Sequence, residues 1–312
     1  MRKSSILKKI GRLIEDNGLC IINIPPHKMT VSLTICDRKG RELSYNYKYS
    51  HLQLLLDYIA TVRVRDLSIS YNDHGTDTPV RLDLSRFSTI EKLSLYNIAV
   101  SSLDAVLSRQ SNITALELNT IEGTVRADTL SSLVRLTRLE LSSITVLGTL
   151  DLSKCTALHT LVLNDCTRTG PILGGCRQLK YLSINSTMDC TVQSLDLSSC
   201  SLMEYLSVDG CLVEGPVPLW LTCLKSLRTL ELTNCSITGS ISTDLLQYFM
   251  YPNGTDSTPV DVHIEYSNTI DEETVQSNLQ YIYYEDRAAV EIKGQTTLCI
   301  YPDTDAYSEY DY

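Results

Sequence analysis

The sequence has no long apolar run. None of its 312 residues lies in a stretch approaching the roughly 18 consecutive apolar residues that a membrane-spanning helix requires. The first 20 residues, MRKSSILKKIGRLIEDNGLC, also lack the unbroken apolar segment of a secretory signal, because charged residues interrupt it throughout. We therefore expect a cytoplasmic protein that does not span a membrane and whose eleven cysteines remain reduced.

Positive charge is also scarce. The chain has 27 Lys and Arg against 37 Asp and Glu, for a formal net charge of −10. The imbalance is concentrated after Asn253, where thirteen acidic residues face only Arg287 and Lys293. A phosphate backbone requires a basic patch, and the sequence offers none, so no nucleic-acid partner is predicted.

Catalytic and metal-binding motifs are missing as well. The five histidines are widely separated, and no HExxH, Walker A, GxSxG or paired CxxC motif is present. Asp73, His74 and Asp77 have metal-binding side chains, but no second histidine lies near them in sequence. Cys299 lies in an expected strand, again without a histidine nearby in sequence. The sequence therefore predicts a protein that is not an enzyme and that uses no metal or cofactor.

What the sequence has in abundance is one repeated pattern, LxxLxLxx. Its second leucine recurs at intervals of 21 to 26 residues, too regularly for coincidence. The eight copies are VRDLSISY (64–71), IEKLSLYN (90–97), ITALELNT (113–120), LTRLELSS (136–143), LHTLVLND (158–165), LKYLSINS (179–186), MEYLSVDG (203–210) and LRTLELTN (227–234).

The spacing has a direct physical meaning. In an LxL triplet, both leucines point to the same face of a short strand. One such strand cannot bury its face alone, so successive copies stack and their leucines form a continuous core. Glycines nine residues after the second leucine indicate a return turn that favours tight turning or positive φ, at Gly148, Gly170, Gly215 and Gly239.

These copies resemble leucine-rich repeats over residues 64–245. GPVPLWLTCLKSLRTLELTNCSITGSIS (215–242) resembles the plant type, whereas TLDLSKCTALHTL (149–161) and SLDLSSCSLMEYL (194–206) resemble a bacterial type. The resemblance implies an α/β repeat fold: a curved solenoid with a concave parallel sheet of about 8 to 9 strands. It also implies protein binding, without naming the partner. The sequence favours a bacterial or phage protein.

The cysteines replace a residue that the family pattern places inside the solenoid. The asparagine that usually follows the strand is here Cys166, Cys211 or Cys235, and elsewhere Ile121, Ile144 or Thr187. A second series lies three or four residues before the first apolar residue of the strand, at Cys155, Cys176, Cys200 and Cys223. Because cysteine behaves as a small buried hydrophobe, we expect two stacked cysteine ladders that serve packing.

The two ends differ from the repeats. Residues 1–17 have the pattern of an amphipathic helix, and TVSLTIC (30–36) and ELSYNYKY (42–49) that of a hairpin capping the first repeat, followed by a short helix at 51–59. This first helix is expected to pack on the solenoid or on a partner subunit. Alternatively, it binds to a membrane surface. Near the other end, 260–266 suggests a last strand and 288–302 a hairpin. We predict caps at 1–60 and 246–312, the latter with an acidic, tyrosine-rich tail, around a solenoid at 61–245.

The expected working surface is the concave sheet. Between and beside the strand leucines it presents Tyr96, Glu117, Arg138, Glu140, Tyr181, Tyr205 and Glu231. Tyr181 and Tyr205 should be neighbours on adjacent strands, as should Glu117 and Glu140. This pattern suits a polar protein interface with tyrosine anchors. The alternative is a structural subunit of a large assembly such as a phage virion, attached through its terminal segments, with the tail tyrosines docking at Tyr307, Tyr310 and Tyr312.

Overall fold

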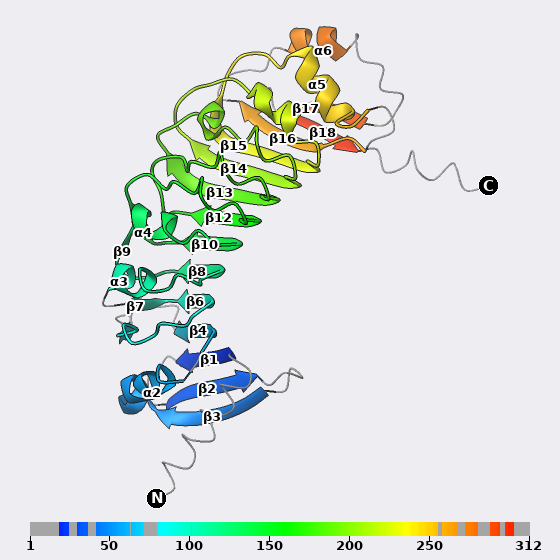
Figure 1. Cartoon of the computed structure of the whole chain (residues 1–312). Coiled ribbons are helices and arrows are strands. Elements are labelled where there is room, and N and C mark those ends of the chain that lie inside the picture. Colours follow the sequence, from blue (N-terminus) through cyan, green and yellow to red (C-terminus); the bar gives the residue numbers. More distant parts are fainter. Residues whose placement is uncertain are drawn as a thin grey trace, which may run out of the picture. The chain divides into compact units, whose positions relative to one another are not determined.

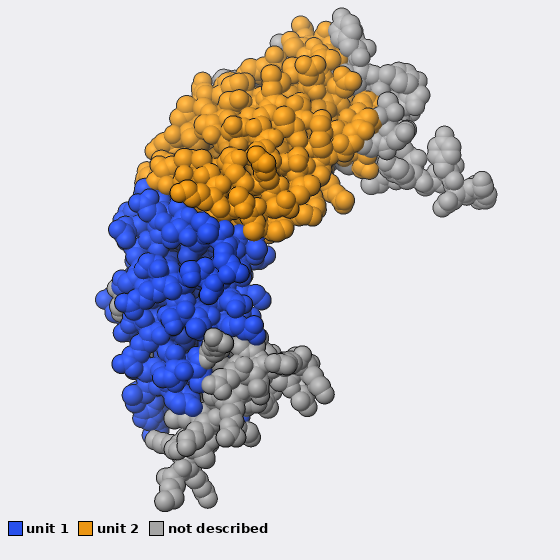
Figure 2. Space-filling model, in the orientation of Figure 1, with its two compact units in different colours: residues 1–148 blue, residues 149–312 orange. Residues whose placement is uncertain are grey.

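The structure is a computed structural model of the whole chain. It describes residues 19–24, 30–36, 42–62, 64–71, 80–100, 102–254, 258–266, 272–279, 288–293 and 297–302. The chain forms two compact units, residues 1–148 and 149–312 (Figure 2). The boundaries expected near residues 60 and 245 remain predictions. The proposed N-terminal helix (1–17), the acidic tail (303–312) and the Asp73–Asp77 loop lie outside the described residues.

Unit 1 contains a mixed sheet with the strand order β3-β2-β1-β4-β6-β8-β10 (Figure 1). Strands β1, β4, β6, β8 and β10 are parallel, and β2 and β3 are antiparallel to their neighbours. The strands are β1 (Leu19–Ile24), β2 (Thr30–Cys36), β3 (Glu42–Lys48), β4 (Asp66–Tyr71), β6 (Lys92–Tyr96), β8 (Ala115–Asn119) and β10 (Arg138–Ser142).

The predicted N-terminal hairpin is confirmed as β2 and β3, and the short helix as η1 (Tyr49–His51) and α2 (Leu52–Ile59). The helix buries Leu52, Leu55, Leu56 and Ile59, which share one helical face. However, the hairpin does not pair with the first repeat strand. Strand β1 lies between β2 and β4, pairing in parallel with β4. Its sequence, LCIINI, lacks the leucine pattern of the repeats, and the sequence analysis missed it.

The returns of unit 1 form a second layer of short elements. Two small parallel pairs, β5 with β7 and β9 with β11, run along this side near the short helices (Figure 1). The elements are β5 (Val80–Leu82), β7 (Ile98–Val100), α3 (Leu103–Leu107), β9 (Thr124–Arg126), α4 (Ala127–Ser131) and β11 (Thr145–Leu147).

Unit 2 contains further copies of the same repeat, and its strands are ordered β12-β13-β14-β15-β16-β18-β17. The first five strands are parallel, so 260–266 is confirmed as a further repeat-like strand, and β17 and β18 form the predicted hairpin. The elements are β12 (Thr160–Asn164), β13 (Tyr181–Met188), η2 (Val192–Leu195), β14 (Tyr205–Cys211), η3 (Leu219–Cys223), β15 (Thr229–Ile237), α5 (Thr243–Met250), β16 (Asp261–Tyr266), α6 (Glu272–Leu279), β17 (Ala288–Lys293) and β18 (Thr297–Pro302).

All eight predicted copies form strands, and their leucines form the core. Along β4 and β12 the burial alternates strictly, with the leucine-type positions inside. Leu116, Leu139, Leu161 and Leu206 are all fully buried. Each such leucine contributes about 1.5–3 kcal/mol relative to an exposed one, so the stacked leucines hold neighbouring repeats together.

Six of the eight repeat copies end in a residue with positive φ. The residue four positions after the second leucine has positive φ in six repeats, at Asn97, Thr120, Ser143, Asp165, Gly210 and Asn234. Its backbone N–H often continues the ladder; that of Thr120, for example, donates to the Ser142 carbonyl at 2.9 Å. The glycine expectation was half right. Gly148 and Gly239 have positive φ, whereas Gly170 and Gly215 are restricted by close neighbours instead.

The two cysteine ladders are largely confirmed. Cys166, Cys211 and Cys235 are buried, and the Cys235 thiol donates to the Val208 carbonyl at 3.1 Å. Cys155, Cys176 and Cys200 are fully buried.

Two members of these series were placed wrongly. Cys223 is exposed, because it lies four rather than three residues before its strand leucine, and Leu224 occupies the buried place. Thr187 is exposed too. An irregularity in β13 between Asn185 and Met188 shifts the register, and Met188 pairs with Cys211 instead.

Candidate protein-binding faces

The side of each repeat strand that faces away from the leucine core carries the seven predicted contact residues. The structure divides them between the units. We call Tyr96, Glu117, Arg138 and Glu140 the unit-1 face, and Tyr181, Tyr205 and Glu231 the unit-2 face. The parallel register aligns equivalent residues of successive strands in columns, which is how positions 23 or 24 residues apart in sequence become neighbours.

Glu117 is the centre of the unit-1 face. Ser94 Oγ donates to its Oε2 at 3.1 Å, and the Tyr96 hydroxyl donates to the same oxygen. Arg138 Nε donates to Glu117 Oε1 at 3.2 Å. Glu117 and Glu140 are directly opposite each other on β8 and β10, as predicted, and Arg138 also forms an ion pair with Glu140. This face is therefore a network in which one arginine bridges two carboxylates.

The network shifts two pKa values. Burial raises the pKa of Glu140, and nearby Glu117 adds to the rise, while Arg138 opposes both. Burial, together with the hydrogen bond to Glu117, raises the pKa of Tyr96 to about 12. At neutral pH Tyr96 is consequently a hydroxyl donor that holds the Glu117 carboxylate in place.

The unit-2 face is built around a stacked pair of tyrosines. Tyr181 and Tyr205 are opposite each other on β13 and β14. Their ring centroids are 4.6 Å apart and the ring planes differ by 6°, so the predicted neighbours are in face-to-face contact. The Tyr205 hydroxyl donates to Glu231 Oε2 at 2.8 Å. Burial raises the pKa of Tyr205 to about 12, and its bond to Glu231 adds to that shift.

Beside the tyrosines lies an acidic hollow of about 370 Å³. Its lining includes Glu231, Asp261 and His263, with Thr229 and Thr233. Burial raises the pKa of Asp261, and the neighbouring Glu231 raises it further, while His263 lowers it. Among the described residues no lysine or arginine forms an ion pair with Glu231 or Asp261. The hollow therefore concentrates negative charge next to an aromatic surface.

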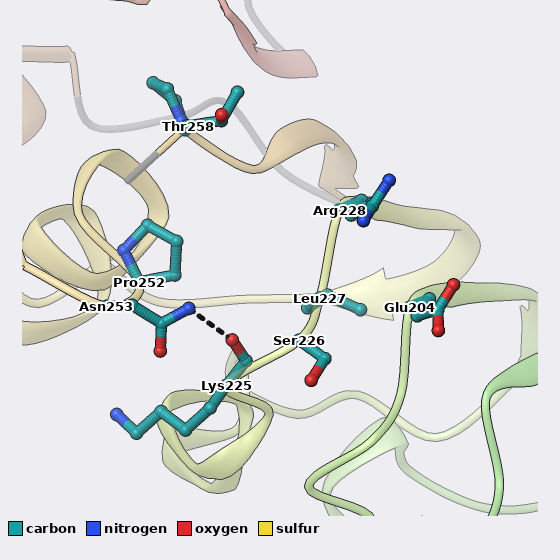
Figure 3. A pocket seen from close by; sticks show the side chains of 9 residues that line it. Glu204, Lys225, Ser226, Leu227, Arg228, Pro252, Asn253 and Thr258 are labelled. Atoms are coloured by element: carbon teal, nitrogen blue, oxygen red, sulfur yellow. Dashed lines mark hydrogen bonds between the residues drawn. The ribbon is translucent and has the colours of Figure 1, made fainter. Parts of the chain in front are cut away.

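A larger hollow, of about 580 Å³, lies before the start of β15 (Figure 3). Glu204, Lys225 and Arg228 give it mixed charge, and Asn253 Nδ2 donates to the Lys225 carbonyl at 2.6 Å. Lys225 Nζ lies 5.7 Å from the centroid of the Tyr248 ring. Its charged groups differ in sign, and we assign no ligand to it.

The structure brings together residues that the sequence analysis kept apart. His263 and Cys299 are opposite each other on antiparallel β16 and β18, with Nδ1 3.5 Å from Sγ. His263 Nε2 lies 3.6 Å from Glu265 Oε1. Only strand pairing across a long connection could have revealed this, because the two residues are 36 positions apart. The Cys299 side chain is fully buried, so this arrangement offers no exposed nucleophile.

Within the described part of the chain, no cluster of three or more His, Cys, Asp or Glu side chains could hold a metal ion. No helix there is long and apolar enough to cross a membrane. The docking tyrosines proposed for the tail, Tyr307, Tyr310 and Tyr312, lie outside that part.

No protein-family model matches the sequence, and no curated protein matches it significantly. Solved structures do resemble it. The plant peptide hormone receptor RGFR1, in complex with RGF2, aligns at 17% identity with a TM-score of 0.49, covering 62% of this chain and 32% of the receptor chain. A leucine-rich-repeat protein of Leptospira interrogans aligns at 15% identity with a TM-score of 0.43, covering 68% of this chain and 57% of that protein. An internalin of Listeria monocytogenes aligns at 16% identity with a TM-score of 0.42, covering 63% of this chain and 60% of the internalin.

The chain thus spans between 32% and 60% of the length of these three proteins. What decides the fold is its own structure, in which each LxxLxL copy forms one strand and successive strands within a unit pair in parallel. The repeats of this chain are leucine-rich repeats. The assignment of individual leucine-rich repeats to the plant or bacterial type remains a prediction.

Proposed function

We propose that this chain is a non-enzymatic protein-interaction module, and that the unit-2 face is its principal contact surface. The observation that carries the proposal is the stacked pair Tyr181 and Tyr205 beside the acidic hollow of Glu231 and Asp261. Tyrosine offers a large contact area with a polar group at its end, and it is enriched among the residues that contribute most to protein interfaces.

The face is suited to recognition because its side chains are already positioned. Tyr205 is held by its hydrogen bond to Glu231 and by its contact with the Tyr181 ring. Its backbone lies in a strand paired on both sides. A partner that binds here does not have to order these groups, so more of the contact energy appears as affinity.

The charge of the face indicates the chemistry of the partner. Glu231 and Asp261 line the hollow with carboxylates, and two aromatic rings lie next to it. A lysine or arginine side chain satisfies both features, through an ion pair and through contact with a tyrosine ring. We therefore propose a partner segment with exposed basic residues. The carboxylates of the unit-1 face already have Arg138 as a partner. We therefore propose that the unit-1 face contributes less to partner binding than the unit-2 face.

The test is a comparison of variants against a partner isolated with the intact chain from its source cells. We expect Tyr205→Ala and the double variant Tyr181→Ala/Tyr205→Ala to lower affinity at least tenfold in calorimetry, because they remove the anchors. The matched control is Tyr205→Phe, which keeps the ring and should stay within about threefold. Unchanged affinity in the double variant, with the fold intact by circular dichroism, would contradict the proposal.

The alternative, a subunit of a large assembly attached through its ends, makes the opposite prediction. In that case deletion of residues 1–17 or 303–312 releases the chain from a large particle, while the tyrosine variants remain bound. Sedimentation of the native protein in its own lysate distinguishes the two. Migration in a large particle at fixed stoichiometry supports the assembly, and migration in a small complex with one partner supports the interaction module.

A further inference from the structure

Cys190 is a cysteine of unit 2 that, like Cys299, belongs to neither ladder. It follows β13, in the return between two repeats, and its side chain is partly exposed. Its Sγ lies 4.0 Å from Sγ of Cys211, which is fully buried at the end of β14 in the next repeat. A partly exposed thiol therefore lies next to one that solvent does not reach.

We propose that Cys190 and Cys211 form a redox-sensitive pair, in which a hydroperoxide oxidises Cys190 and Cys211 then closes a disulfide between neighbouring repeats. The geometry is suitable, since the two sulfur atoms need to approach by only about 2 Å to reach bonding distance. The backbones are held side by side, because the Val213 N–H donates to the Cys190 carbonyl at 3.3 Å and the Leu212 N–H to the Met188 carbonyl at 2.9 Å.

The surroundings of Cys190 favour its thiolate, the form that reacts with oxidants. The hydrogen bond with the Cys211 thiol lowers the pKa of Cys190, and the Ser194 side chain and the Gly170 backbone lower it further, while burial opposes the shift. The same contact raises the pKa of Cys211. Cys190 is thereby the attacking thiol and Cys211 the protonated partner that resolves the product.

Gly170 provides the space for this arrangement. A Cβ atom at that position would lie 3.3 Å from Cys190 Sγ and 3.1 Å from Leu195 Cδ2, closer than ordinary contact. This is one of the two glycines in the regular return position that do not have positive φ. Its lack of a side chain is therefore connected to the packing around the Cys190 thiol rather than to backbone conformation.

The chemistry balances with hydrogen peroxide as the oxidant. The Cys190 thiolate attacks one peroxide oxygen, the O–O bond breaks, a sulfenic acid forms, and the released hydroxide takes up a proton to become water. The Cys211 sulfur then attacks the Cys190 sulfur, the S–S bond forms as the S–O bond breaks, and the Cys211 proton leaves in a second water. Two thiols lose two electrons, and the peroxide gains them. A thiol reductant reverses the reaction.

The experiment treats the intact, reduced chain with a small excess of hydrogen peroxide, blocks the remaining thiols and identifies linked peptides by mass spectrometry. Cleavage after Lys180 and Glu204 gives a 181–204 peptide with Cys190, and cleavage after Glu214 gives a 205–214 peptide with Cys211. We expect these two peptides to be linked, with fragmentation placing the bridge at Cys190, and to separate on addition of dithiothreitol.

Two matched variants sharpen the result. Cys190→Ser should abolish the link, and Cys200→Ser, which removes the other cysteine of the same peptide, should leave it unchanged. A link from 205–214 to the peptide 232–265, which contains Cys235, overturns the proposal. So does an absence of any link to Cys211 in the folded wild-type chain. Because the wild-type result decides by itself, the proposal remains falsifiable even where a variant fails to fold.

Discussion

The two units use one repeat to make two different surfaces. On the unit-1 face the carboxylates of Glu117 and Glu140 share Arg138, so charge is neutralised within the face. On the unit-2 face the tyrosine pair lies beside Glu231 and Asp261, and Glu231 accepts its hydrogen bond from a neutral hydroxyl. The leucine positions are the same in both. The buried column therefore encodes the fold, and the exposed column determines the charge and aromatic character of each face.

The returns differ as well. Unit 1 builds its returns from short helices and two small parallel pairs. The returns of unit 2 include η2, η3 and α5, and the buried cysteines of both ladders belong to this unit. Small buried thiols and glycines allow neighbouring returns to approach closely, and this makes unit 2 the more sensitive to added volume.

The largest effect we expect is for Gly175→Ala in unit 2. A Cβ atom at Gly175 would lie 1.7 Å from the Ser153 carbonyl oxygen, so the backbone of one return must move away from the next. We expect a loss of about 3 kcal/mol or more in the free energy of unfolding. Urea unfolding followed by fluorescence reports it, because the single tryptophan, Trp220, is buried in unit 2.

The neighbouring residue supplies the control for this change. A Cβ atom at Gly174 would meet nothing within 4 Å, and this glycine does not have positive φ. Gly174→Ala should be neutral, or stabilising by about 0.4–1 kcal/mol through the unfolded state. Equal losses for the two variants would show that close approach of the returns is not what restricts position 175.

The next effect is a loss of stability in alkali that the buried thiols of unit 2 produce. Burial raises the pKa of Cys155 to about 11, and that of Cys166 and of Cys176 to about 12. In the unfolded chain a thiol ionises near pH 8.5. Above about pH 8.5 the unfolded state therefore binds fewer protons than the folded state, and stability falls as pH rises toward the folded values. Below that pH the contribution is fully present.

Urea midpoints of the reduced chain at pH 7.5, 9 and 10.5 measure this trend through Trp220 fluorescence. Cys176→Ala should lower stability at neutral pH by leaving a small cavity, but its midpoint should decline less steeply with pH than that of the wild type. Parallel declines in the two proteins would mean that other groups, such as tyrosines, cause the alkaline loss.

A smaller effect should be measurable at the tyrosine stack. A double-mutant cycle with Tyr181→Ala and Tyr205→Ala should give a coupling of about 0.5–1.5 kcal/mol, the range for stacked aromatic pairs. With Tyr205→Phe in place of Tyr205→Ala the coupling should fall close to zero, because this substitution keeps the ring contact that the cycle measures. A coupling near zero in the cycle with both alanine substitutions would indicate that the two rings contribute independently, and would weaken the case for a preformed anchor.

The fold was largely predictable because leucine spacing is a local signal that directly encodes burial. Each of the eight copies became a strand, and the column neighbours Tyr181 and Tyr205 followed from equal spacing. The position of Cys223 failed because one extra residue separates it from its strand leucine, and burial depends on register rather than on residue type.

Other parts of the site were not predictable because they depend on pairing between distant segments. Strand β1 lacks the repeat pattern and is identified only by its partner β4. His263 lies opposite Cys299 through the antiparallel pairing of β16 with β18. This pairing cannot be predicted from the repeat periodicity. Asp261 and His263 lie in a strand that was predicted from the sequence, but its place beside Glu231 of the unit-2 face was not.

The smallest expected effect concerns the neutralised charge of unit 1. Arg138→Ala leaves Glu117 and Glu140 opposite each other without their shared cation. These groups are partly exposed, so the loss of stability at pH 7 should stay below about 1 kcal/mol. Hydrogen exchange in peptides containing β8 and β10 localises the loss to unit 1. Arg138→Lys keeps a positive charge without the bridging geometry, so its stability should lie between that of the wild type and that of Arg138→Ala.

The pH dependence of this loss separates electrostatics from packing. Burial and Glu117 already raise the pKa of Glu140, and Arg138 opposes that rise, so removing the arginine raises the pKa further. A carboxyl with a raised pKa takes up its proton first as pH falls, and the repulsion disappears with the charge. The difference between Arg138→Ala and the wild type should therefore shrink through the acidic range. A difference that stays constant from pH 7 to pH 4 would assign the effect to lost packing of the arginine stem, and the contrast between a neutralised and an acidic face would no longer rest on charge.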